Sequence, residues 1–166
     1  VHEDLRLSFL PLSHIYARTC DYYSWLWAGH RLALAQSRET VVPDCQELSP
    51  TLLNGVPYFF ERLCRVLTEK GLADTVGAFN ATLGGNLRIC NSGGAALPDH
   101  VFDFIRKQGV PMLQGYGMTE ASPVITCCSL EHTRRSSSGR AIPQVEIRIA
   151  DDGEILTKGP QVMVGY

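Results

Sequence analysis

The residues best suited to chemistry stand where two expected strands end in glycine-rich loops. One loop is Ser92-Gly93-Gly94-Ala95 and the other is Gly115-Tyr116-Gly117-Met118-Thr119-Glu120. Glycines allow backbone N–H groups to approach a flat base or a phosphate closely. Tyr116 offers a ring for stacking, Thr119 a hydroxyl, and Glu120 a hard oxygen ligand of the kind that Mg²⁺ prefers. Together these residues predict a site for the base and phosphates of a nucleotide.

Spacing alone also permits a purely structural interpretation of the same residues. A Gly-Gly pair after a strand often forms only a tight turn, and Tyr116 fits a core position equally well. The phosphate-loop pattern GxxxxGK is absent, Gly115-Tyr116-Gly117 lacks the third glycine of the dinucleotide fingerprint, and no GxSxG marks a nucleophilic serine. The residue types by themselves therefore leave both interpretations open.

The elements that position the two loops form a predicted βαβ unit. A strand over 87–91 precedes the first loop, and a helix follows from Pro98 to Gly109 with Val101, Phe102 and Ile105 on its inner face. A second strand over 110–114 leads into the second loop. Strands joined by such a crossover run parallel. Because ligands collect at the carboxyl ends of parallel strands, we expect both loops, and a third strand end at Gly55-Val56-Pro57, to converge.

The rest of the chain up to residue 133 also alternates between strands and helices. We expect strands over 5–10, 31–35 and 51–56, a polar, turn-like segment over 37–48, helices over 15–28 and from Pro57 to Gly71, and a short helix before Gly84-Gly85. In the helix over 15–28, Tyr16, Cys20, Tyr23 and Trp27 recur at helical spacing and predict one shared face.

The last segment has a different pattern. Val145-Glu146-Ile147-Arg148-Ile149 alternates strictly, and Asp151-Asp152-Gly153-Glu154 is a strong hairpin turn before Ile155-Leu156-Thr157. The expected class is therefore α/β, with a parallel βαβ sheet over residues 1–133 followed by an antiparallel β segment over 134–166.

Composition excludes several function classes. The 166 residues carry a net charge of −2, and a protein that binds nucleic acid by neutralising phosphates usually has a basic excess. Since no apolar run approaches the roughly 20 residues of a membrane span, we expect a soluble, cytoplasmic protein, with any peripheral membrane contact outside these residues. The six cysteines form no CxxC, the histidines are scattered, and no dedicated metal cage is expected.

Five segments in order resemble the long-chain fatty acyl-CoA synthetases. The matched family segments are LPLSHxxER, GVPRVFEK, SGGAPL, GYGxTE and GEIxxxGPxVMxGY, and they correspond to residues 10–18, 55–62, 92–97, 115–120 and 153–166. The set covers nearly the whole chain. The sequence is thus similar to part of the large N-terminal domain of an adenylate-forming acyl-CoA ligase.

The resemblance implies a two-step reaction. A fatty acid carboxylate attacks the α-phosphate of ATP to give acyl-AMP and pyrophosphate, and the CoA thiol then displaces AMP. By similarity, Gly93, Gly94 and Ala95 line the adenine pocket, together with Gly115 and Gly117, and Tyr116 flanks the base. The resemblance also implies that Thr119 contacts a phosphate, that Glu120 holds Mg²⁺ and that His14 lies near the acyl carboxylate.

Departures from the family pattern bear on that expectation. The TSGTTGxPKG loop, the ribose-binding TGD and the lysine-bearing C-terminal domain are absent, so we expect a fragment truncated at both ends and inactive alone. Ala17, Tyr58 and Gln144 differ from the usual residues, and the stretch over 62–87 is shorter than in long-chain members. The alternatives are an adenylation module for an aryl or amino acid, or a non-catalytic nucleotide-binding module.

Overall fold

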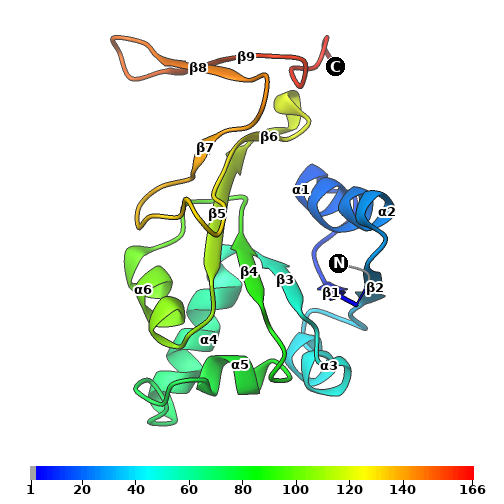
Figure 1. Cartoon of the computed structure of the whole chain (residues 1–166), viewed down its shortest axis with the longest axis vertical. Helices are drawn as coiled ribbons and strands as arrows, with labels where there is room; N and C mark the ends of the chain where they lie inside the picture. Colours follow the sequence, from blue (N-terminus) through cyan, green and yellow to red (C-terminus); the bar gives the residue numbers. More distant parts are fainter. Residues whose placement is uncertain (1–2) are drawn as a thin grey trace.

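The protein is built around a mixed β-sheet flanked by helices (Figure 1). The computed structural model describes residues 3–166, and within them the main sheet has seven strands in the order β2-β1-β3-β4-β5-β6-β7. The strand bounds are Leu5–Ser8 (β1), Arg31–Leu34 (β2), Leu52–Gly55 (β3), Ile89–Ser92 (β4), Met112–Gly117 (β5), Val124–Cys127 (β6) and Arg140–Ala141 (β7). Strands β1 to β5 are parallel, whereas β6 and β7 pair antiparallel. The predicted α/β class is confirmed.

The helices fall into two groups. The segment α1–η1–α2 contacts one face of the sheet near β1 and β3, and α3 to α6 contribute to the core on the other. The bounds are Ile15–Ala17 (α1), Arg18–Tyr23 (η1, a π-helix), Ser24–Ala28 (α2), Val41–Leu48 (α3), Pro57–Glu69 (α4), Ala78–Thr82 (α5), Asp99–Lys107 (α6) and Thr119–Ala121 (η2, a 3₁₀-helix). Among residues 3–166, no helix is long and apolar enough to cross a membrane.

The hydrophobic core lies between the sheet and helices α3 to α6. It is formed by alternate strand residues and by the inner faces of the helices; Leu7, Leu53, Cys90, Met112, Phe60, Val101 and Ile105 are fully buried. The inner face predicted for α6 is therefore confirmed. Since side chains alternate along a strand, the neighbours Arg6, Ser8 and Asn54 project from the opposite face, and this polar face reaches the site.

The segment 37–48 was predicted to be turn-like, but its residues 41–48 form a helix, so that prediction was wrong. Helix α3 spans Val41–Leu48, and Val41 and Cys45 are buried in the core. Their spacing of four residues places them on one helical face. Pro43 lies in the first turn, where the missing N–H has no intrahelical partner to lose.

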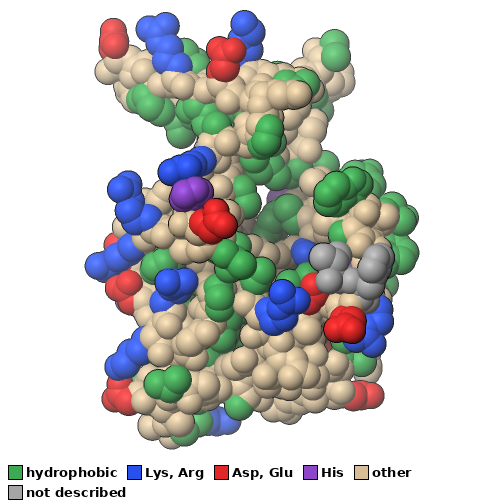
Figure 2. All heavy atoms as spheres, in the orientation of Figure 1, with side chains coloured by type: hydrophobic (Ala, Val, Ile, Leu, Met, Phe, Trp, Pro, Cys, Tyr) green, Lys and Arg blue, Asp and Glu red, His purple; other side chains and the backbone are tan. Residues whose placement is uncertain are grey.

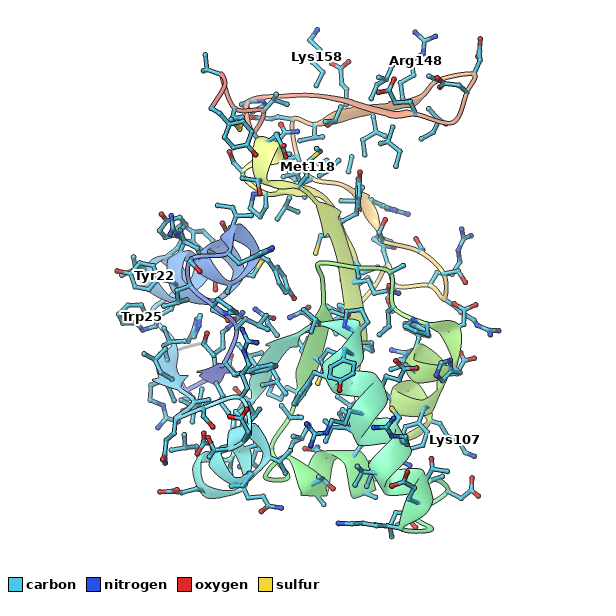
Figure 3. The ribbon with its side chains drawn as sticks, turned by 180° about the vertical axis from the view of Figure 1, so that it is seen from behind. Tyr22, Trp25, Lys107, Met118, Arg148 and Lys158 are labelled. Atoms are coloured by element: carbon cyan, nitrogen blue, oxygen red, sulfur yellow. The ribbon has the colours of Figure 1, made fainter. Side chains whose placement is uncertain are left out.

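The helical stretch over 15–28 ends at Gly29 as predicted, with Gly29 left-handed at φ 69°. Its predicted shared face is wrong, because Tyr23 is 49% and Trp27 91% exposed. The π-helix η1 widens the turn, so a spacing of three and four residues no longer keeps side chains aligned. Asp21 becomes the buried position instead. Figure 3 shows the outer side of this segment, where Tyr22 and Trp25 point away from the sheet.

The C-terminal residues form the predicted hairpin. Strands β8 (Glu146–Ile149) and β9 (Ile155–Lys158) pair antiparallel around a turn in which Gly153 has φ 89°. The hairpin stands apart from the main sheet, at the top of Figure 1. Strand β7 lies inside the segment 134–166 yet extends the main sheet through β6. The boundary between residues 133 and 134 stays a prediction.

Candidate active site

A cavity of about 520 Å³ opens at the carboxyl ends of the parallel strands. Its walls come from α1 and η1 on one side, from the ends of β3, β4 and β5 below, and from β6 and η2 on the other side. Figure 2 shows a hollow below the C-terminal hairpin, between the part of the molecule that carries α1 and α2 and the part that carries β5 and β6. The convergence of strand ends that the βαβ pattern predicted is therefore present.

Most of the predicted site residues line this one cavity. They are His14, Gly93, Gly94, Gly115, Tyr116, Gly117, Thr119 and Glu120. Tyr116 is 38% exposed, so it is not a core residue. Ala95 is exposed and is not among the lining residues, since the chain turns outward after Gly94, whose φ is 81°. The segment Gly115–Gly117 is not a loop but the end of β5, paired with β6.

Two glycines are required by contacts inside the chain. A Cβ at Gly117 would lie 1.9 Å from the carbonyl oxygen of Pro123, where β5 and β6 shift register. A Cβ at Gly93 would lie 2.8 Å from the ring of Tyr16. Tyr16 therefore packs directly over the end of β4 and forms one wall of the cavity. Burial raises the pKa of Tyr16 well above its ordinary value, so its hydroxyl stays protonated.

His14 occupies the N-cap position of α1. Its ring Nδ1 accepts a hydrogen bond from the backbone N–H of Tyr16 at 3.2 Å. In a neutral imidazole one nitrogen accepts and the other carries the proton, so this contact places the ring proton on Nε2. His14 is exposed and lines the cavity. It can therefore donate a hydrogen bond to an oxygen of a bound ligand.

Glu120 lies in η2 at the mouth of the cavity. Its Oε1 accepts a hydrogen bond from the hydroxyl of Tyr166 at 3.1 Å, and its backbone carbonyl accepts one from the N–H of Met163 at 2.8 Å. The hydrogen bond to Glu120 raises the pKa of Tyr166. Met118, labelled in Figure 3, lies beside η2 and also lines the cavity. The C-terminal residues thus hold the η2 turn in place.

The donor set at Glu120 fits a magnesium ion bound together with phosphates. Mg²⁺ usually takes one or two protein carboxylates and completes its shell with water and substrate phosphate oxygens. Glu120 supplies one half-buried carboxylate beside the hydroxyl of Thr119. Within residues 3–166, no three His, Cys, Asp or Glu side chains cluster into a cage that would hold a metal by itself.

Sequence reasoning missed a buried polar network on the floor of the cavity. Asp21 of η1 is fully buried and accepts hydrogen bonds at its carboxylate from Ser8 Oγ at 2.8 Å, Asn54 Nδ2 at 2.6 Å and Arg6 Nη1 at 3.3 Å. Asn91 Nδ2 in turn donates to Asn54 Oδ1 at 2.9 Å. Burial nevertheless raises the pKa of Asp21, because loss of water outweighs the donors.

A signal for this network was present in the sequence. Arg6 and Ser8 occupy alternate positions of an otherwise apolar strand, so they share one face of the sheet. Charged residues inside a buried strand are unusual unless they are paired. The partner, Asp21, lies in the π-helix, and no helical spacing indicates that it faces the sheet. Three members of the network, Arg6, Asn54 and Asn91, line the cavity.

Comparison with known proteins places the chain in a family. It matches the AMP-binding enzyme family over residues 1–166. It is 26% identical over 202 aligned positions to the long-chain-fatty-acid–CoA ligase FadD15 of Mycobacterium bovis, covering 96% of this chain and 33% of that protein. It is 32% identical over 134 residues to the 2-succinylbenzoate–CoA ligase of Listeria monocytogenes, covering 70% of this chain and 29% of that protein.

A solved structure shares the fold. The O-succinylbenzoate coenzyme A synthetase of Bacillus subtilis, in complex with ATP and magnesium ion, superposes with a TM-score of 0.74 at 26% identity. The match covers 100% of this chain and 35% of that protein. The parallel sheet with a cavity at its strand ends is thus shared with a coenzyme A synthetase whose structure holds ATP and a magnesium ion.

The chain belongs to the AMP-binding enzyme family, as the five sequence segments predicted. It spans about a third of the length of the curated relatives that it matches first. The alignment with FadD15 is longer than this chain, so that relative has residues inside the matched region that this chain lacks. These relatives include ligases of fatty and of aryl acids, and the family assignment alone does not select between them.

Proposed function

We propose that the whole protein is an acid–CoA ligase that activates a long-chain fatty acid. In the first step the carboxylate attacks the α-phosphate of ATP, which forms acyl-adenylate and releases pyrophosphate. In the second step the thiol of CoA displaces AMP. The observation that carries the proposal is that His14, Gly93, Gly94, Thr119 and Glu120, separated in sequence, line one cavity.

The residues of this chain divide the first step between them. Gly94 leaves room for a flat base at the end of β4, and Tyr116 lines the cavity with it. At Gly93 the Tyr16 ring already occupies the space of a side chain, so Gly93 allows Tyr16 to form that wall of the cavity. Thr119 donates its hydroxyl to a phosphate oxygen, and Glu120 holds Mg²⁺. When bound, this ion offsets the negative charge that phosphate oxygens carry during transfer. Ala95 does not line the cavity, so we assign it no contact.

His14 positions the acid. Its Nε2–H donates to one carboxylate oxygen and leaves the other free to attack, while the bond at Nδ1 fixes the ring orientation. The Tyr16 ring beside it closes the cavity toward the sheet and excludes water from the reacting oxygens. Both tasks depend on His14 capping α1, because the cap hydrogen bond joins His14 to the backbone N–H of Tyr16.

The choice of a long-chain acid rests on similarity. The fatty-acid ligase relative aligns with 96% of the chain, including the segment Leu10–Arg18 that carries His14, whereas the 2-succinylbenzoate ligase aligns with 70%. The second candidate is an aryl acid, and the higher identity of that shorter match, 32%, favours it. The two candidates predict different acids in the same assay.

The test is ATP–pyrophosphate exchange by the full-length protein, with hexadecanoate and 2-succinylbenzoate as the two acids. We expect exchange to depend on hexadecanoate, and Glu120→Gln to lower it roughly 100-fold, as removal of one charge-stabilising group does in other active sites. Glu131→Gln, at an exposed position outside the cavity, is the matched control and should leave the rate unchanged. Wild-type exchange in Glu120→Gln, or exchange with the aryl acid alone, contradicts the proposal.

A further inference from the structure

The two carboxylate oxygens of Glu120 have different surroundings. Oε1 accepts a hydrogen bond from the hydroxyl of Tyr166 at 3.1 Å. Within residues 3–166, Oε2 accepts no hydrogen bond, although Glu120 lines the cavity. One oxygen of the carboxylate that we propose as the Mg²⁺ ligand is therefore engaged by the protein, and the other is available to a ligand.

The segment that follows strand β9 brings Tyr166 to this carboxylate. The backbone N–H of Met163 donates to the carbonyl oxygen of Glu120 at 2.8 Å, so the segment is bound to the same residue twice. Gln161 Nε2 donates to Thr157 Oγ1 of β9 at 3.3 Å, which ties the segment to the hairpin. Figure 1 shows the C-terminal end beside the turn that carries η2. The backbone thus holds the Tyr166 hydroxyl close to the Glu120 side chain.

The hydroxyl contact restrains a side chain that otherwise rotates freely. A glutamate carboxylate stands at the end of a long side chain and samples many rotamers unless a partner fixes it. Carboxylates that ligate metals are themselves hydrogen-bonded by neighbouring groups, and loss of such a partner typically lowers metal affinity or activity by about 10–100-fold. Among the residues that the structure describes, Tyr166 supplies the only hydrogen bond to the Glu120 carboxylate.

The same contact limits how many oxygens Glu120 offers to a metal. Mg²⁺ demands a near-ideal octahedral shell, whereas Ca²⁺ takes about six to eight oxygens in a flexible shell and accepts a carboxylate through one or both oxygens. Because the Tyr166 hydroxyl engages Oε1, binding of a metal through both oxygens competes with this hydrogen bond. A carboxylate that offers one oxygen suits Mg²⁺ and denies Ca²⁺ a second ligand.

We propose that Tyr166 is a positioning residue that makes Glu120 a one-oxygen metal ligand and thereby makes the site prefer Mg²⁺ to Ca²⁺. The inference rests on the proposed function, because it concerns the metal that accompanies ATP in that reaction. Tyr166 is not among the residues that line the cavity, so it acts through Glu120 rather than by touching the substrates.

The test measures binding of α,β-methylene-ATP, which cannot be cleaved at the bond that adenylate formation breaks, to the full-length protein by isothermal titration calorimetry. Each protein is titrated in excess Mg²⁺, in excess Ca²⁺ and in EDTA. The ratio of the Kd in Ca²⁺ to the Kd in Mg²⁺ reports the metal preference. The Kd in EDTA reports the nucleotide pocket without a metal, and none of the three values depends on turnover.

Tyr166→Phe removes only the hydroxyl from a side chain that is 97% exposed, so little packing is lost. We expect its Kd in Mg²⁺ to rise roughly tenfold, its Kd in Ca²⁺ to rise less or to fall, and its Kd in EDTA to stay the same. Tyr58→Phe is the matched control. Tyr58 is 69% exposed on α4, lies outside the cavity and makes no hydroxyl hydrogen bond within residues 3–166, so none of the three values should change.

Three results for Tyr166→Phe would overturn the inference. An unchanged ratio of the two Kd values would mean that the hydroxyl does not select between the metals. A lower Kd in Mg²⁺ would mean that the hydroxyl obstructs the metal. A Kd in EDTA that rises as much as the Kd in Mg²⁺ would mean that Tyr166 shapes the nucleotide pocket and has only a structural role.

Glu120→Gln separates failure of the inference from failure of the proposed function. If Glu120→Gln raises the Kd in Mg²⁺ while Tyr166→Phe leaves the ratio unchanged, the metal-binding role of Glu120 stands and only the inference is wrong. If Glu120→Gln binds the nucleotide in Mg²⁺ as tightly as the unaltered protein does, the metal-binding role in the proposed function is wrong, and the inference is overturned with it.

Discussion

Replacing Arg6 with methionine is the sharpest test of how this fold is held together. The Arg6 and Asp21 side chains are 10% and 0% exposed, and Nη1 lies 3.3 Å from Oδ1. Arg6 Nη1 also donates to the backbone carbonyl of Cys20. Removing one member of a buried ion pair leaves the other charge uncompensated and costs about 3–5 kcal/mol. That loss is a large part of the about 5–15 kcal/mol by which domains are stable.

The measurement is urea unfolding of the protein and of Arg6→Met. With a urea m-value of about 2 kcal/mol/M, a loss of about 3 kcal/mol lowers the midpoint by about 1.5 M. Arg65→Met is the control, because Arg65 and Glu69 are both 66% exposed and their N–O distance is 4.0 Å. An exposed pair of this kind contributes about 0.5 kcal/mol or less.

The pH dependence gives an independent check with a definite sign. Burial raises the folded-state pKa of Asp21, whereas the charge of Arg6 lowers it, so Arg6→Met raises that pKa further. A carboxyl with a raised folded pKa binds its proton more tightly in the native than in the unfolded chain. Its contribution to stability therefore increases as pH falls through the folded pKa and decreases above it. The deficit of Arg6→Met should be largest near neutral pH and shrink on acidification toward the ordinary aspartate range.

Two outcomes would refute this reasoning. A midpoint shift no larger than that of Arg65→Met would mean that the Asp21 carboxylate is not left uncompensated when Arg6 is removed. A full-sized deficit that does not change with pH would mean that lost packing of the arginine stem, rather than the buried charge, causes the destabilisation.

Two further predictions concern packing and thiol chemistry. Gly117→Ala should lower stability by about 1–3 kcal/mol in thermal unfolding, because its Cβ would meet the carbonyl of Pro123 at 1.9 Å; an unchanged Tm would show that β6 moves without cost. Desolvation raises the pKa of both the Cys127 and the Cys90 thiol, but Cys127 is exposed and Cys90 is fully buried. Iodoacetamide at mildly alkaline pH should therefore modify Cys127 first, as read by peptide mass spectrometry; equal rates in the native protein would contradict the burial of Cys90.

Local sequence patterns predicted most of the elements that carry the site. Pro57 and Gly29 mark a helix start and a helix end because each restricts or frees one backbone angle, and that effect is local. The alternation before Asp151-Asp152-Gly153 predicts the hairpin for the same reason. The helix α3 was missed because its segment is mostly polar and contains few apolar residues besides Val41 and Cys45, so no helical periodicity stands out in the sequence. Burial of these two side chains in the core stabilises the helix.

The candidate site was predictable only in part. The strand ends at Ser92 and Gly115 converge by topology, so the βαβ pattern is sufficient to bring them together. Ala95 was expected in the lining because it is adjacent in sequence to Gly94, yet the left-handed turn at Gly94 directs the chain outward. Strand β6 was not predicted, although its Cys127 and Val124 form one wall of the cavity.

The sequence by itself determined the family, the α/β class and the residues that gather at the strand ends, because these depend on motifs, periodicity and connection rules within short stretches. The tertiary structure alone decided that Asp21 meets Arg6, Ser8 and Asn54 beneath the cavity. Those residues are separated by up to 48 positions, and a π-helix turns Asp21 toward the sheet. No local spacing encodes such a contact, since it arises from the packing of one element against another.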